Sequence, residues 1–178
     1  MDCSLLNVAN QAAPVMLCKE SSFNTIAAIS AIVGAYGLIF TVITYWQNRR
    51  IAQNKATIDL IFSNENSDHF KGNNLIFSHH RENGGFDALV HAQTGDERTK
   101  RKAVADYLNH YELIALGIRR GVLNSGFYRK WMGTVVLRDW NAAQPFVAGE
   151  RQKVQSDGSS HTKAYDNLEW LAEKKWRD

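Results

Sequence analysis

Glu112 is the residue whose type and surroundings best suit it to chemistry, because it lies between Tyr111 and Leu113 in an apolar stretch. A buried carboxylate must find a partner or take up a proton. Arg138 is its natural partner, since it falls one predicted helix later. The two side chains could form a general base or a ligand-binding pair, but we favour a structural ion pair that joins two helices.

Two asparagines could extend this pair. Asn109 and Asn141 could hydrogen-bond across helices in the same layer, and Asn141 could instead cap a helix. Both roles are structural. The sequence therefore predicts a polar layer made of Asn109, Glu112, Arg138 and Asn141, and no residue is assigned as catalytic.

The residue types that bind metals or act as nucleophiles are not spaced for those roles. The chain has 6 His residues, but His79 and His80 are neighbours, and neither HxxxH nor HExxH occurs. Cys3 and Cys18 precede the main domain, so they could pair with each other or stay free, but they cannot work with its histidines. Phosphate-binding glycine loops and the G-x-S-x-G motif are also missing. We expect no metal, no cofactor and no enzymatic activity.

Composition and charge narrow the function classes further. With 178 residues, 44% hydrophobic and 22% charged, the chain suits one folded domain and a little more, and not a disordered protein. The formal net charge of +3 is small for a nucleic-acid-binding protein, so we expect no nucleic-acid partner. A basic cluster at residues 98–102 could contact lipid headgroups or nucleic acid, but a solvated face offset by the preceding acidic residues is favoured.

One segment is long and apolar enough to cross a lipid membrane. Residues 23–46 contain no charge and would form a helix of roughly 36 Å, against about 30 Å for a hydrocarbon core. The preceding residues lack the positive region of a cleaved signal peptide, so we expect an uncleaved, single-pass anchor. Arg49 and Arg50 follow it. By the positive-inside rule, the N-terminus should lie outside a bacterial inner membrane and the C-terminal domain in the cytoplasm.

Small residues recur on one face of this segment. Ala27, Ala31, Gly34 and Ala35 would let two helices approach closely. The alternative is ordinary span composition, because small residues are common in membrane helices. A homo-oligomer formed through the span is therefore one expectation.

Helical periodicity dominates the residues after the span. No Gly or Pro interrupts residues 38–63, which predicts that the span helix continues as a stalk. Apolar residues at 104–118 recur with helical spacing over about four turns, and shorter helices are predicted at 69–80, near 86–90, after Asn124 and in the tail. Pro145 should end or kink the helix that follows Asn124. No stretch alternates over strand length, so we predict an all-α fold in which three or four helices pack at the inner end of the stalk.

These patterns divide the chain into four parts. The predicted parts are a short extracytoplasmic segment at 1–22, the transmembrane helix at 23–46, a cytoplasmic helical domain at 47–154, and a linker with an amphipathic tail helix at 155–178. The tail could dock on the membrane or pack back on the bundle, and packing is favoured.

The block between Tyr107 and Phe146 contains YLNHYELIALGIRRG and, later, RDWNAAQPF. It resembles an uncharacterised family of bacterial and prophage-borne proteins that have one N-terminal span, a helical domain and the pattern YLNxxExIAxGIxxGI…Y…W…RxW. The matching residues are Tyr107, Leu108, Asn109, Glu112, Ile114, Ala115, Gly117, Ile118, Gly121, Tyr128, Trp131, Arg138 and Trp140. The resemblance implies the architecture and a mobile-element context, and it brings no established activity.

The favoured function is a membrane-anchored, non-enzymatic interaction protein. Its partners would be the lipid membrane and another protein, and the resemblance points to phage exclusion or abortive infection. The alternative is a membrane-bound enzyme centred on Glu112. A pore-former is disfavoured, because Thr41 and Thr44 alone cannot line a pore with polar groups.

Overall fold

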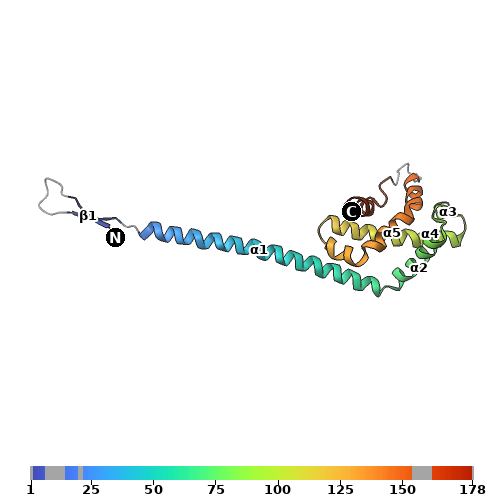
Figure 1. Cartoon of the computed structure of the whole chain (residues 1–178), viewed down its shortest axis with the longest axis horizontal. Helices are drawn as coiled ribbons and strands as arrows, with labels where there is room; N and C mark the ends of the chain where they lie inside the picture. The colour runs from blue at the N-terminus through green and yellow to red at the C-terminus, as the bar shows by residue number, and fades with distance from the viewer. Residues whose placement is uncertain (1, 7–14, 20–21, 154–161, 178) are drawn as a thin grey trace. The chain divides into compact units, whose positions relative to one another are not determined.

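The computed structural model describes residues 2–6, 15–19, 22–153 and 162–177 (Figure 1). The chain forms two compact units, Met1–Arg49 and Arg50–Asp178. The long helix α1 (Ser22–Glu65) begins in the first unit and ends in the second. The predicted all-α class is confirmed from residue 22 onward.

The first unit also contains a two-stranded antiparallel hairpin that the sequence pattern did not predict. Strand β1 (Asp2–Leu6) pairs with β2 (Val15–Lys19), and the register makes Cys3 and Cys18 cross-strand partners. Successive apolar residues in β2 hide the alternation that identifies a half-buried strand. Pairing of the two thiols stays a prediction, because the side chains of these residues lie outside the described part of the chain.

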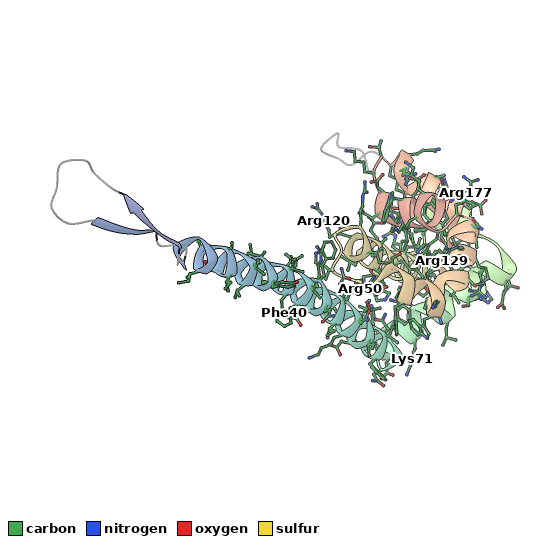
Figure 2. All side chains as sticks on the ribbon, turned by 60° about the vertical axis from the view of Figure 1, so that its left-hand side comes forward. Phe40, Arg50, Lys71, Arg120, Arg129 and Arg177 are labelled. Atoms are coloured by element: carbon green, nitrogen blue, oxygen red, sulfur yellow. The ribbon has the colours of Figure 1, made fainter. Side chains whose placement is uncertain are left out.

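The part of α1 in the first unit exposes an apolar surface on all sides. Every side chain from residue 26 to residue 43 is exposed, and Phe40 projects from the helix with 72% of its surface free (Figure 2). Its two threonine hydroxyls are satisfied within the helix, since Thr41 and Thr44 donate to carbonyls one turn earlier at 2.8 Å. A helix in hydrocarbon needs this internal satisfaction. By length and composition, α1 could therefore span a membrane.

Local signals set the helix ends in the second unit. After α1 ends at Glu65, the Ser67 hydroxyl accepts a hydrogen bond from the Phe70 N–H at 3.2 Å and caps α2 (Asp68–Asn83). Gly84 and Gly85 then adopt positive φ angles of 76° and 91°, which only glycine adopts freely. They form the turn into the short helix α3 (Phe86–Val90), near the predicted position.

The core of the second unit is built on α4 (Gly95–Arg119). A capping box between Thr94 and Glu97 begins this helix. Its predicted apolar stripe is buried, and the stripe consists of Val104, Tyr107, Leu108, Tyr111, Ile114, Ala115 and Ile118. The stripe is therefore the surface against which the neighbouring helices pack.

Helix α5 (Ser125–Gln152) continues through Pro145, so of the two predicted outcomes, an end or a kink of the helix, the end is wrong. Proline removes the hydrogen bond to the carbonyl of Asn141. Both residues are exposed, so water can satisfy that carbonyl, while Phe146 and Val147 are buried and hold the next turn against the core.

The tail packs back on the bundle. It consists of α6 (Asp166–Glu169) and the π-helical turn η1 (Trp170–Lys175), and it buries Leu168, Leu171 and Trp176. The Trp176 indole donates to the Ser125 hydroxyl at 3.1 Å. The predicted linker at 155–160 lies outside the described residues. Burial of the tail favours packing over docking on a membrane surface.

The close packing of α5 against α3 can be tested at Gly149, with Gly72 in α2 as the control. A Cβ on Gly149 would lie 2.5 Å from Val90 Cγ2, whereas a Cβ on Gly72 would meet nothing within 4 Å. We expect Gly149→Ala to lower the free energy of unfolding by about 1–3 kcal/mol through overpacking. Gly72→Ala should raise it by about 0.5–1 kcal/mol, because alanine favours a helix. Denaturant unfolding followed by circular dichroism measures both, and equal shifts of the same sign would refute the close approach of α3 and α5.

Candidate functional site

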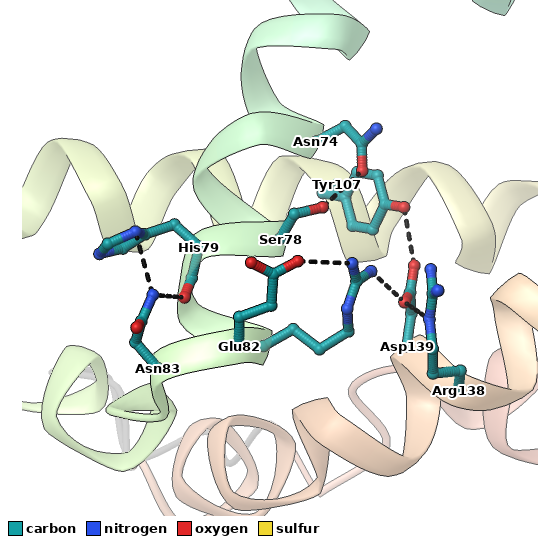
Figure 3. A network of polar contacts seen from close by, with 9 residues as sticks. Asn74, Ser78, His79, Glu82, Asn83, Tyr107, Arg138 and Asp139 are labelled. Atoms are coloured by element: carbon teal, nitrogen blue, oxygen red, sulfur yellow. Dashed lines mark hydrogen bonds and ion pairs between the residues drawn. The ribbon is translucent and has the colours of Figure 1, made fainter.

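One fully buried carboxylate joins α2, α4 and α5. Asp139 has no exposed surface. Its Oδ1 accepts hydrogen bonds from Arg81 Nη1 at 2.7 Å and Arg138 Nε at 3.2 Å. Its Oδ2 accepts a bond from the Tyr107 hydroxyl at 2.8 Å (Figure 3). Both oxygens are therefore satisfied, as a buried charge requires.

The charges of this network are fixed by its surroundings. Burial, with a contribution from the negative charge of Asp139, raises the pKa of Tyr107, so its hydroxyl stays protonated and donates. The Tyr107 and Tyr111 hydroxyls lie 2.9 Å apart. Burial lowers the pKa of Arg81, but the hydrogen bond and charge of Asp139 outweigh it and raise the pKa overall. The network therefore holds an ionised Arg81–Asp139 pair and a neutral tyrosine.

The network borders a cavity of ≈ 340 Å³. The cavity takes its polar lining from three helices and its apolar lining mainly from aromatic rings. The lining residues are Asn64, Phe70, Asn74, Ser78, Arg81, Tyr107, Tyr128, Trp131, Met132, Val135 and Arg138. A cavity of this size with an apolar wall and a few convergent polar groups is typical of small-molecule sites.

A second hollow is an apolar groove of ≈ 450 Å³ in the second unit. It lies between the end of α1 and the start of α5, and it is lined by Ile58, Ile61, Phe62, Phe127, Lys130 and Trp131. Phe62 is 63% exposed and Trp131 40%. The Trp131 ring lines both the groove and the cavity.

The predicted ion pair between Glu112 and Arg138 does not form. The Glu112 carboxylate accepts the backbone N–H of Asn167 at 3.2 Å, its side-chain amide at 2.7 Å and the backbone N–H of Leu168 at 2.7 Å. These are free donors in the first turn of α6, where a carboxylate is favourable. Glu112 therefore fastens the tail to α4.

The structure does not assemble the predicted polar layer. Asn109 and Asn141 are exposed, and within residues 22–153 no hydrogen bond or ion pair joins any two of the predicted four. The buried layer is instead Arg81, Tyr107 and Asp139. A signal for Asp139 was present, because it falls on the buried stripe of α5 with Val136, Trp140 and Ala143. Arg81 offered no such signal, since it lies near the end of the mostly polar helix α2, where the sequence does not indicate which helix the side chain contacts.

Residues 24–176 match the family described as a domain of unknown function (DUF4760), and the chain belongs to this family. No curated protein and no solved structure matches the chain.

Removal of the buried carboxylate should destabilise the bundle. Asp139→Ala strands the Arg81 guanidinium and the Tyr107 hydroxyl, and we expect a loss of about 3–5 kcal/mol in unfolding free energy. Asp139→Asn should cost less, because one acceptor oxygen remains. Glu82, 71% exposed and 3.6 Å from Arg81, is the matched control; Glu82→Ala should cost no more than about 1 kcal/mol. Similar unfolding midpoints for all three variants would contradict a structural role for Asp139.

Proposed function

We propose that the chain is a single-pass membrane protein that holds a helical binding domain at the cytoplasmic face of a bacterial inner membrane. The observation that carries this proposal is helix α1, whose residues 26–43 are exposed and which is apolar and long enough for a span. Such a surface is unfavourable in water and favourable in lipid. Beyond residue 49 the same helix belongs to the bundle, so anchor and domain share one element.

Binding is better supported than catalysis. Glu112, on which the enzyme alternative was centred, accepts three hydrogen bonds from the tail and thus has a structural task. The apolar groove supports a protein partner, because exposed apolar surface is typical of interaction sites. Self-association through Ala27, Ala31, Gly34 and Ala35 stays a prediction, which a membrane two-hybrid comparison with Ala31→Ile/Ala35→Ile would test.

The proposed orientation can be tested by protease accessibility. Arg49, Arg50 and Lys55 follow the span, so the domain should remain in the cytoplasm. Protease added to intact spheroplasts should spare a C-terminal tag, and the same protease should remove it after lysis. Removal of the tag from intact spheroplasts would reverse the orientation. Release of the chain by alkaline carbonate would refute the span itself.

The proposed setting is exclusion of phage, which rests on the resemblance to prophage-borne proteins. Expression of the chain should lower the plating efficiency of some phages in a broad panel. A variant with Ile32→Arg and Val33→Arg should lose this effect, because each charge at a span centre costs about 2.5–3.5 kcal/mol. Gly72→Ala serves as the control and should retain protection. Unchanged plating across the panel would contradict this setting.

A further inference from the structure

We infer that the cavity beside Asp139 binds a small carboxylate with an aromatic or flat apolar body. The site lies entirely within residues 64–138, so it is separate from the anchor and from the apolar groove except for the shared ring of Trp131. The inference would stand even if the chain were not membrane-bound.

The first support is an excess of hydrogen-bond donors. Nε is the one side-chain atom of Arg138 with a partner in the described residues, so both terminal nitrogens of its guanidinium are unused. Asn74 uses its oxygen to accept from Ser78 at 3.3 Å, which leaves its amide nitrogen to donate. A ligand that meets these groups must accept hydrogen bonds, and an ionised carboxylate only accepts.

The second support is charge. Arg81 and Arg138 are the charged residues that line the cavity in the described part of the chain. Asp139 lies behind them and already accepts three hydrogen bonds, so it neutralises one guanidinium and cannot serve as the acceptor for another ligand group. Glu82 contacts Arg81 from solvent, where its charge is screened. About one positive charge therefore remains for the ligand, which fits a monoanion better than a phosphate dianion.

The third support is the apolar lining of the cavity. Phe70, Tyr107, Tyr128 and Trp131 line it with rings, and Met132 and Val135 complete it. Phe70 and Tyr107 are stacked at 5.5 Å between ring centroids, and Tyr128 and Trp131 meet edge to face at 5.9 Å. Such rings favour a flat apolar body, while the guanidinium fork gives the carboxylate a fixed direction. The volume of ≈ 340 Å³ admits a free small molecule and is too confined for a folded partner.

The test uses the full chain in detergent micelles, labelled with 5-fluorotryptophan. The chain has 5 Trp residues, and Trp131→Phe identifies the fluorine resonance of Trp131. The probes are 2-naphthoate and its neutral isostere 2-naphthamide. We expect naphthoate to shift the Trp131 resonance with an affinity roughly tenfold or more above that of naphthamide, because only the anion can pair with Arg138. The Trp46 resonance reports partition of either probe into the micelle.

Two variants complete the test. Arg138→Gln should abolish the preference for naphthoate while the helical circular dichroism is retained, since Arg138 is 53% exposed and Asp139 keeps Arg81 and Tyr107. Arg120→Gln, an exposed arginine outside the cavity, should keep the preference. Equal affinities for the two probes, movement of Trp46 without Trp131, or an unchanged preference in Arg138→Gln would each overturn the inference.

Discussion

The burial of the Asp139 carboxylate constrains the arrangement of the helices around it. A charge with no contact with water is tolerated only where its partners reach it in good geometry. Arg81 comes from α2 and Tyr107 from α4, so both helices must meet α5 at one level. The same contact places the Arg81 and Arg138 guanidinium groups at the edge of the cavity. Stability and the candidate binding site therefore depend on one carboxylate.

Polar groups in apolar surroundings are satisfied in two different ways along the chain. In the apolar part of α1, Thr41 and Thr44 donate to the backbone of their own helix, so no neighbour is needed. In the bundle, Asp139 and Glu112 use donors from other helices. A helix suited to lipid must satisfy the hydrogen bonds of its own polar groups. A polar group buried between helices also determines which helices pack against one another, because its partners come from them.

Sequence was informative where the determining chemistry is local. Ser67 and Gly84–Gly85 set the ends of α2 through their own hydroxyl and backbone groups, and a helix at 69–80, between these signals, was predicted. The partners of Glu112 were not predicted, because they are two backbone amides and one side-chain amide some 55 residues away, which are brought to Glu112 only when the tail packs on α4. The predicted end of the helix near Pro145 was wrong for a related reason, since the cost of a missing hydrogen bond depends on whether water reaches the carbonyl. The hairpin was missed because the two strands are defined by the hydrogen bonds between them, and the residue composition of each strand alone does not reveal that pairing.

The tail has a consequence for the order in which the protein assembles. Helix α1 leaves the ribosome before the helices of the bundle, and α4 follows well before residues 165–176, which cover one side of α4. Until then the nascent bundle lacks the side chains of Leu168, Leu171 and Trp176, and it exposes the apolar surface that they later bury. Closure of the domain is thus a late step of biogenesis. A chain that stalls before the tail packs would expose this apolar surface to chaperones and proteases. Quality control can therefore act after the anchor is inserted and before the domain is complete.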